Sequence, residues 1–313
     1  MTKPDRWIEE TFHPHWRVRL EASKVLHEVK TDHQHLVIFE NETWGTVLML
    51  DGVCQLTTSD EFVYHEMMAH VPLMALKGPE RVLVVGGGDG GVMREVLKHP
   101  SIAKATLCEI DRSVVDLSLR HYPEVADGCY EDKRCDLVIA DGLKYVAGTT
   151  EKFDAIIVDS SEPIGPSAVL HTPEFFADCR RALKEGGILV TQNGLPFLFP
   201  DQLAGTTRAL GALFKRVAPY LCTQPCYFGG PFALNWASDT PELAEISVKK
   251  LGRRQEKRSI TTRYWTPAVH VAAFALPAYA LRVVEAALAP EVPKPKPRAK
   301  AKRVTRARKP ASP

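Results

Sequence analysis

The chain has 313 residues, of which 45% are hydrophobic and 25% are charged, and its formal net charge is +2. This composition is ordinary for a folded globular protein and excludes collagen-like, coiled-coil and wholly disordered chains. The length allows one large domain or two smaller ones with a substantial core. We expect no membrane span, because the most apolar stretch, Val271–Leu281, is short, contains Pro277 and is followed by Arg282.

Cysteine usage and the N-terminal residues predict the cellular compartment. Met1–Thr11 carries charges and lacks the apolar segment of a secretory signal. Seven scattered cysteines without a C-x-x-C pair argue against a disulfide framework and predict a reducing, cytoplasmic location. Cys222 and Cys226 could form half of a zinc site, but no second ligand pair follows at usable spacing. We therefore expect buried thiols without a metal.

Basic charge is concentrated at the C-terminal end. The segment Val292–Pro313 contains nine Lys and Arg residues and no acidic residue. Without it 31 basic and 38 acidic residues remain, a net charge of −7, which suits a protein that binds cationic substrates. We expect residues 291–313 to form a disordered tail, because their composition cannot form a core. The tail has no aromatic residue for base stacking, so any binding to polyanions would be weak and electrostatic.

Residues 1–70 are predicted to form a β-rich N-terminal domain. The expected strands are Val18–Val29, Leu36–Phe39, Thr46–Leu50 and Cys54–Thr58. The Asp51–Gly52 pair predicts a tight turn between the last two of them. Acidic Asp60 and Glu61 then open a helix.

Residues 71–290 show strands alternating with helices, which predicts a mostly parallel, doubly wound sheet of the α/β class. The expected strands are Arg81–Val85, Ala105–Ile110, Cys135–Ala140, Ala155–Val158 and Ile188–Thr191. The expected helices are Val92–Lys98, Arg112–Arg120, Pro173–Lys184, which ends at Gly186 and Gly187, and Asp201–Phe214. Such sheets bind ligands at the carboxyl ends of their strands, so residues following each strand are candidate site residues.

Three consecutive strand ends carry features of an adenosine site. The first strand runs into the loop Gly86–Gly91, whose backbone can approach a ligand closely. Glu109 ends the second strand, 23 residues after Gly86, where an acid commonly accepts hydrogen bonds from ribose hydroxyls. Asp141 and Gly142 end the third strand, where adenine would bind. The glycine loop alone would indicate only a tight turn, but the three features together favour an adenosyl ligand.

Asp89, inside the glycine loop, restricts the kind of adenosyl ligand. Its carboxylate would repel the pyrophosphate of a dinucleotide and the carboxylate of S-adenosylmethionine, but it would attract an amine. Decarboxylated S-adenosylmethionine, which has a cationic arm without a carboxylate, fits this charge. The alternative is that Asp89 points to solvent or caps the following helix.

The fourth strand runs into a loop with two carboxylates, Asp159 and Glu162, constrained by Pro163 and Pro166. This loop is either a helix-capping turn or a clamp for a cationic amine. An alkylammonium must lose a proton before it attacks carbon, and a nearby carboxylate can accept that proton. Because the ordinary pKa values of an amine (~10.4) and of Asp (~3.9) lie far apart, water or neighbouring groups must carry the proton away.

These residues resemble those of the spermidine synthases, the bacterial-type polyamine aminopropyltransferases. The resemblance runs from about Trp7 to Ala287 and rests on the segments Leu50–Gln55, Asp60–Met67, Gly86–Gly91, Cys108–Asp111, Asp159–Pro166 and Ala272–Leu276. It implies a small N-terminal β domain, a Rossmann-like catalytic domain with a methyltransferase-like sheet, and a homodimer. It also implies transfer of an aminopropyl group from decarboxylated S-adenosylmethionine, a co-substrate, to putrescine, giving spermidine and 5′-methylthioadenosine without a metal or other cofactor.

The resemblance assigns a role to each matching residue. Asp159 matches the catalytic proton acceptor. The positions that contact the aminopropyl donor are Gln34, Asp89, Glu109, Asp141, Gly142 and Pro166. The positions that contact the polyamine are Gln55, Tyr64, His65, Asp89, Asp159, Ser160, Ser161, Glu162 and Tyr227. Glu162 replaces the usual Asp of the family and Cys226 its usual Thr, so a different amine acceptor stays an alternative.

Other functions remain as alternatives. A methyltransferase that uses S-adenosylmethionine usually has an acid late in the first strand, where this chain has Val84 and Val85. A polyamine-binding module without turnover would lack Asp159 or the glycine loop, and both are present. A metal site could be sought among His13, His15, His27, His33 and His35. They form no tight constellation, so we expect surface or local hydrogen-bonding roles for them.

Overall fold

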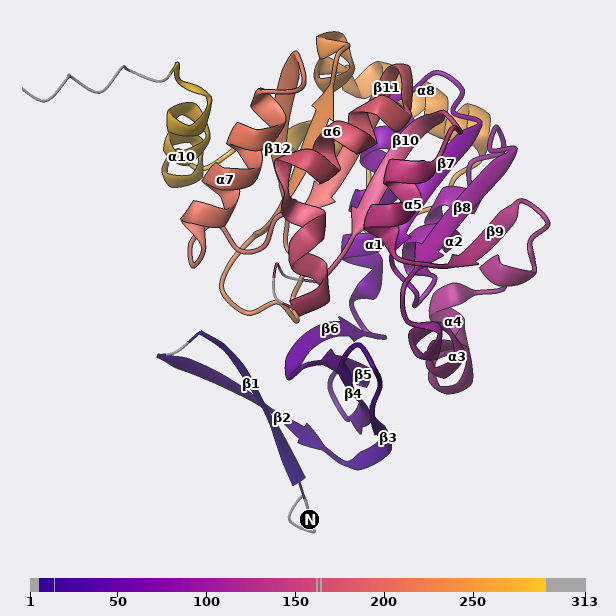
Figure 1. The fold of residues 1–313 in the computed structure, drawn as a ribbon, viewed down its shortest axis with the longest axis vertical. Helices are drawn as coiled ribbons and strands as arrows, with labels where there is room; N and C mark the ends of the chain where they lie inside the picture. The colour runs from indigo at the N-terminus through magenta and orange to yellow at the C-terminus, as the bar shows by residue number, and fades with distance from the viewer. Residues whose placement is uncertain (1–5, 14, 162, 164, 291–313) are drawn as a thin grey trace, which may run out of the picture.

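The computed structural model describes residues 6–290 except 14, 162 and 164 (Figure 1). The described chain forms three β-sheets, two small ones near the N-terminus and one large sheet flanked by helices. In this part of the chain no single helix is long and apolar enough to span a membrane. Helices α9 (Pro267–Ala273) and α10 (Ala278–Leu288) meet that test only as a pair bent by 61°. The expected basic tail, residues 291–313, lies outside the described residues.

The two small sheets lie below the larger domain in Figure 1 and are antiparallel. The first contains β1 (Arg6–His13) and β2 (Trp16–Ala22), and the second contains β3 (Lys24–Lys30), β4 (His35–Asn41), β5 (Gly45–Leu50) and β6 (Val53–Thr57). The turn expected at Asp51 is present, because Asp51 (φ 50°) and Gly52 (φ 78°) both have the left-handed backbone that a two-residue hairpin needs.

The prediction of a single strand over Val18–Val29 is wrong, because two strands in different sheets divide this segment. Ser23 lies between them. Its backbone N–H and its hydroxyl both donate to the carbonyl oxygen of Glu40 at 2.9 Å. The chain therefore leaves the first sheet at Ser23 and joins the second.

The large sheet has the strand order β12-β13-β11-β10-β7-β8-β9. Its strands are β7 (Arg81–Gly86), β8 (Lys104–Glu109), β9 (Cys135–Ile139), β10 (Phe153–Asp159), β11 (Leu183–Gln192), β12 (Arg216–Cys222) and β13 (Phe232–Ser238). The five strands from β7 to β11 run parallel, as expected, and β12 and β13 are antiparallel to their neighbours. The carboxyl ends of β7, β8, β9 and β10 therefore meet at one edge of the sheet.

Helices cover both faces of the large sheet (Figure 1). They are α1 (Glu61–Ala75), α2 (Gly91–Leu97), α3 (Arg112–His121), α4 (Pro123–Ala126), α5 (Gly142–Gly148), α6 (Pro173–Ala182), α7 (Pro200–Gly211), α8 (Val248–Arg258), α9 and α10, with 3-10 turns at Cys129–Glu131, Gly165–His171 and Pro241–Glu245. Successive side chains of a strand point to opposite faces. Val82 and Val84 accordingly pack with α1, α2 and α8, whereas Leu83 and Val85 pack with α5, α6 and α7.

The boundary between α6 and β11 differs from the expectation. The helix ends at Ala182 and the strand already begins at Leu183, so Gly186 and Gly187 lie inside β11 and do not terminate the helix. Gly186 has a φ of 72°, and the register between β10 and β11 shifts in this region. A β-bulge accommodates glycine well, which explains how two glycines fit into a strand.

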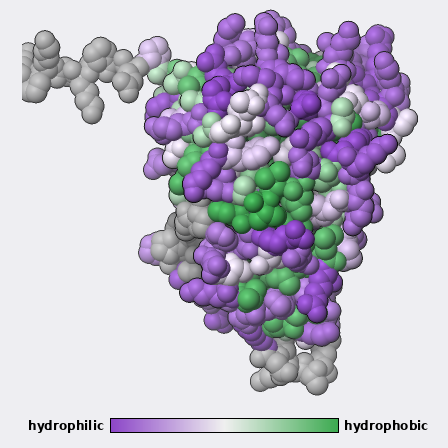
Figure 2. Space-filling view, turned by 45° about the vertical axis from the view of Figure 1, so that its right-hand side comes forward, coloured by the Kyte–Doolittle hydropathy of each residue, from purple (hydrophilic) through white to green (hydrophobic). Residues whose placement is uncertain are grey.

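The four-stranded N-terminal sheet packs against helix α3 of the larger domain. Leu36 and Ile38 on one of its faces pack against Val114 and Leu117 of α3, and all four side chains are buried. This contact places the turns of the small sheet opposite the strand ends of the large one. Most of the face seen in Figure 2 is hydrophilic, with hydrophobic residues gathered just above the level of the N-terminal sheets.

Candidate active site

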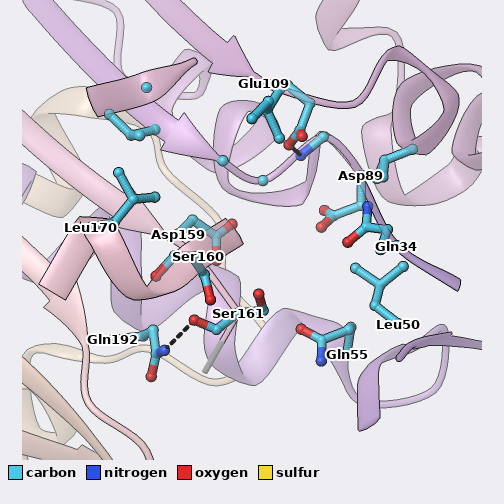
Figure 3. Close-up of a pocket in the computed structure, with 18 of the residues that line it drawn as sticks. Gln34, Leu50, Gln55, Asp89, Glu109, Asp159, Ser160, Ser161, Leu170 and Gln192 are labelled. Atoms are coloured by element: carbon cyan, nitrogen blue, oxygen red, sulfur yellow. Dashed lines mark hydrogen bonds between the residues drawn. The ribbon is translucent and has the colours of Figure 1, made fainter. Parts of the chain in front are cut away.

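A cavity of about 280 Å³ lies between the strand ends of the large sheet and the N-terminal sheet (Figure 3). It brings together residues from distant parts of the chain that were expected to form the site. Those lining it are Gln34, Gln55, Tyr64, His65, Asp89, Glu109, Asp141, Gly142, Asp159, Ser160, Ser161 and Tyr227. Of the remaining expected residues, Glu162 and the side chain of Pro166 lie outside what the structure describes.

The glycine loop leaves room for a carboxylate as well as for a ligand. In the parallel pairing of β7 with β10, Gly86 lies opposite Asp159. Gly87 has a φ of 70°, and a Cβ atom there would lie 2.5 Å from Asp159 Oδ2. A side chain at Gly87 would therefore be strained by its backbone and would also displace the Asp159 carboxylate.

Glu109 is fixed at the end of β8 by two backbone donors. Its carboxylate accepts hydrogen bonds from Gly88 N at 3.1 Å and from Asp111 N at 2.9 Å. Burial nevertheless raises the pKa of Glu109 to about 7. Gln34 lies in the loop between β3 and β4 of the N-terminal domain, and its Nε2 donates to Asp111 Oδ2 at 3.2 Å. This bond links the strand end to the N-terminal domain.

Asp141 caps α5, since Oδ1 accepts from Leu143 N at 3.0 Å and from Lys144 N at 3.3 Å. The carboxylate therefore orients the helix N-terminus that borders the cavity. Gly142 lies against Val85, and a Cβ atom at Gly142 would lie 2.6 Å from Val85 Cγ1. Because Gly142 has no side chain, α5 can approach β7 closely.

Asp89 combines the two alternatives stated for it from the sequence. Its Oδ1 accepts from Gly91 N at 2.7 Å at the start of α2, and the same atom lies 3.5 Å from His65 Nε2. The side chain is 16% exposed and lines the cavity. Asp89 thus stabilises the helix start and also directs negative charge into the site.

Asp159 is a second carboxylate of the cavity whose pKa is strongly raised. Tyr64 Oη donates to Oδ1 at 2.8 Å, while Oδ2 is buried and has no hydrogen-bond partner among the described residues. Burial first, and the charge of Asp89 second, raise the pKa of Asp159 well above its usual value, although His65 and Tyr64 oppose this rise. A buried carboxylate oxygen without a partner is a suitable acceptor for a ligand N–H.

Polar groups line the opposite end of the cavity. Tyr227 Oη donates to the carbonyl oxygen of Gln55 at 2.7 Å. Gln192 Nε2 donates to the carbonyl oxygen of Ser161 at 2.9 Å (Figure 3). The Ser160 hydroxyl lies 3.2 Å from His171 Nε2. Gln192 and Phe232, which also lines the cavity, were not expected from the sequence. Gln192 ends β11, the fifth parallel strand, and this position at a strand end is the one sequence feature that could have identified it.

Cys226, a departure from the family pattern, lies behind the cavity wall. It is buried and packs in one cluster with Cys54, which lines the cavity. Six of the seven cysteines are buried, as expected, and Cys135 is half-buried; all seven are free thiols in the structure. One side-chain nitrogen or oxygen atom each of His65, Asp89 and Asp159 lies within 4.8 Å of the others, so two carboxylates and one imidazole meet in the cavity. No other group of three His, Cys, Asp or Glu side chains lies this close together in the part of the chain that the structure describes.

The parallel sheet, the glycine loop and the acidic strand ends define a Rossmann-like transferase. The model of the spermine/spermidine synthase domain matches residues 61–249, and that of the spermidine synthase tetramerisation domain matches residues 6–58. The chain belongs to the spermine/spermidine synthase family. The predicted family, fold and enzyme class are thereby confirmed.

Individual relatives cover nearly the whole described chain. A polyamine aminopropyltransferase of a Ruegeria species is 47% identical over 279 residues, covering 89% of this chain and 98% of the relative. Polyamine aminopropyltransferase 1 of Pseudomonas aeruginosa is 45% identical over 276 residues, covering 88% and 96%. The structure of a spermidine synthase in complex with the transition state analogue AdoDATO superposes with a TM-score of 0.85 at 34% identity, covering 90% and 96%. The spermidine synthase of Thermotoga maritima superposes with a TM-score of 0.82 at the same identity, covering 90% and 94%.

Proposed function

We propose that the enzyme transfers the aminopropyl group of decarboxylated S-adenosylmethionine to putrescine, giving spermidine and 5′-methylthioadenosine. The observation that supports this most directly is the pair of carboxylates, Asp89 and Asp159, which lie within 4.8 Å of each other and of a His65 ring nitrogen, in a cavity that Glu109 also lines. Such a site attracts a cationic arm and repels the carboxylate of intact S-adenosylmethionine.

In the proposed reaction, an ammonium group of putrescine first gives one N–H proton to the Asp159 carboxylate and becomes a neutral amine. The nitrogen lone pair then forms a bond to the aminopropyl carbon next to the sulfonium. The C–S bond breaks, and its electron pair stays on sulfur, so methylthioadenosine leaves as a neutral thioether. The positive charge passes to the new secondary amine of spermidine, which leaves as an ammonium group. Because the thioether of a sulfonium is already a good leaving group, the protein mainly aligns the reactants and handles one proton.

The other cavity residues would bind the two substrates. Glu109 would accept hydrogen bonds from the ribose hydroxyls of the donor, with Gln34, Asp141 and Gly142 around the adenosine. Asp89 would hold the amine of the aminopropyl arm. Toward the acceptor, the polar groups Gln55, Tyr64, Ser160, Ser161 and Tyr227 would line the path of the diamine. This chemistry needs no metal or further cofactor. We further propose that the enzyme forms a homo-oligomer through its N-terminal sheets and that it is located in the cytoplasm.

A product assay tests the proposal. Purified enzyme would be given decarboxylated S-adenosylmethionine with putrescine, cadaverine, agmatine or spermidine in turn, and methylthioadenosine and the new polyamine would be measured. We expect turnover with putrescine and none with intact S-adenosylmethionine as donor. Methyl transfer from intact S-adenosylmethionine would contradict the proposal, and preference for another amine would change only the acceptor.

A further inference from the structure

His65 lies between the cavity and a buried network of charges. Its Nδ1 lies 2.6 Å from Glu61 Oε2, and its Nε2 lies 3.5 Å from Asp89 Oδ1. The side chains of His65 and Glu61 are only 5% and 6% exposed. Because Glu61 precedes His65 by one helical turn in α1, the two side chains meet on the same helix face. Nδ1 thus faces the Glu61 carboxylate, and Nε2 faces Asp89 and the cavity.

Arg94 of α2 holds the Glu61 carboxylate at both oxygens. Its Nη2 donates to Oε2 at 2.8 Å and its Nη1 to Oε1 at 3.2 Å. Arg94 is itself fixed, since it also donates to the carbonyl oxygen of Val125 at 2.7 Å and to Glu95 Oε1 at 2.8 Å. The imidazole of His65 packs directly on Gly91, where any Cβ atom would clash with it. The ring therefore has little freedom to turn.

The charged groups facing His65 come from three elements. Glu61 lies on its own helix, Asp89 in the loop between β7 and α2, and Asp159 at the end of β10. Tyr64 contacts the ring edge, with ring centroids 5.7 Å apart. The three carboxylates outweigh the opposing effect of burial and raise the pKa of His65 to about 9. This direction of the pKa favours the cationic imidazole at neutral pH, and the charge of His65 in turn lowers the pKa of Asp159.

We propose that Glu61, held by Arg94, is a positioning residue that orients His65 and keeps it cationic beside Asp159, so that Asp159 stays ionised to accept the amine proton. The inference rests on the proposed function, because it assigns Asp159 as the proton acceptor. It adds a role for two residues, Glu61 and Arg94, that do not line the cavity.

The variant Glu61→Gln tests this role, because it keeps the shape of the side chain and removes its charge. His65 would lose its proton at a lower pH, and a neutral His65 would no longer stabilise the Asp159 carboxylate. We expect the acidic limb of the pH profile of kcat/KM for putrescine to move to higher pH by about one unit or more, the usual effect of a charge at this distance.

Glu66→Gln is the matched control. Glu66 is also buried in α1, but it accepts hydrogen bonds from the backbone N–H groups of Arg263, Tyr264 and Trp265 and does not face His65. We expect this variant to lower thermal stability without moving the acidic limb. A limb that moves equally in both variants would show a general effect of buried charge and would overturn the inference.

A double-mutant comparison separates action through His65 from direct action on Asp159. In a His65→Gln background, Glu61→Gln should move the acidic limb no further. The inference fails if the Glu61→Gln profile superimposes on that of the wild type, or if the shift persists in the His65→Gln background.

A measurement on the unaltered enzyme covers the case in which Glu61→Gln does not fold. In ¹⁵N NMR, His65 should carry a proton on Nδ1 and remain an imidazolium above pH 8. Titration of His65 near its ordinary pKa of about 6.5 would overturn the inference. Failure of the wild-type product assay, with the NMR result as expected, would instead reject the proposed function.

Discussion

At the scale of single residues, the chemistry depends on how the carboxylate of Asp159 is held. Tyr64 donates to one of its oxygens, and the other is buried against Gly87 without a partner among the described residues. Burial and Asp89 raise its pKa, which brings this carboxylate closer to the pKa of an amine. Proton transfer from an alkylammonium is therefore less unfavourable than to an ordinary aspartate.

The variant Asp159→Asn keeps the size of the side chain but cannot accept the amine proton. We expect kcat to fall by about 10²-fold or more, the usual effect of losing a general base. Binding of the adenosyl donor should change less, because Glu109 and Asp141 are untouched. Single-turnover kinetics and calorimetry on the same preparation measure the two effects. A near-normal kcat would remove Asp159 from the chemical step.

Asp89→Asn tests the discrimination between donors. The amide removes the negative charge that would pair with the aminopropyl amine and repel a donor carboxylate. We expect weaker binding of decarboxylated S-adenosylmethionine and relatively stronger binding of the intact form. Isothermal calorimetry with both ligands measures the ratio of the two affinities. A ratio equal to that of the wild type would show that Asp89 only caps α2.

At the scale of secondary-structure elements, α1 and α2 are joined by ion pairs that also border the site. Arg94 bonds to Glu61 and Glu95, and Glu95 lies 3.0 Å from His70 Nε2. These side chains are at most 11% exposed. Removing one partner of such a buried ion pair strongly destabilises the fold, because the remaining charge is buried without an opposite charge beside it. The network therefore fixes the start of α2, and with it the glycine loop, relative to α1.

Acid should weaken this network in a defined pH range. The partners His65 and Arg94 lower the pKa of Glu61 from 4.5 to about 2, despite its burial. A depressed carboxylate pKa stabilises the fold above pH 4.5, and this contribution is lost as the pH falls toward 2. At roughly 1.4 kcal/mol per unit, it amounts to about 3 kcal/mol. Urea unfolding should show Glu61→Gln clearly less stable than the wild type at pH 7, with the difference shrinking below pH 4.5. A difference independent of pH would contradict this assignment.

At the scale of the whole molecule, the site exists only where the two domains meet. The strand ends of the large sheet supply Asp89, Glu109 and Asp159. The N-terminal sheet supplies Gln55 from β6 and Gln34 from the loop between β3 and β4. The sheet is held in place by its apolar contact with α3. Neither domain alone would enclose the cavity, so the N-terminal domain has a part in the site besides any role in assembly.

The basic tail is expected to act independently of this folded body. Truncation after Pro290 should leave thermal stability and turnover nearly unchanged, because the composition of the removed segment cannot contribute to a core. Only the full-length chain should bind a polyanion such as heparin at low salt and release it as salt rises. Loss of activity or folding on truncation would show that the tail is structural.

Local sequence patterns were sufficient for the five parallel strands of the large sheet, whereas its antiparallel strands β12 and β13 were not predicted. The signals for the parallel strands come from residues that are neighbours in the chain. They are the apolar run Arg81–Val85 followed by glycines, and the acids Glu109 and Asp159 at the ends of later strands. The parallel order then brings these strand ends to one edge. Local signals were weaker where glycines lie inside a strand, at Gly186 and Gly187, since the same residues also end helices.

The tertiary structure alone determined the surroundings of each charge. Glu61 appeared from the sequence to be a helix-opening acid, and only the packing of α2 on α1 brings Arg94 to it and aligns His65 with Asp89. Gln192 reaches Ser161 through the pairing of β10 with β11. The sequence by itself determined the family, the fold class and the candidate carboxylates, because short segments encode strands, turns and acidic strand ends. The pKa of each group and the partners behind the cavity depend on contacts between distant segments, which no local pattern specifies.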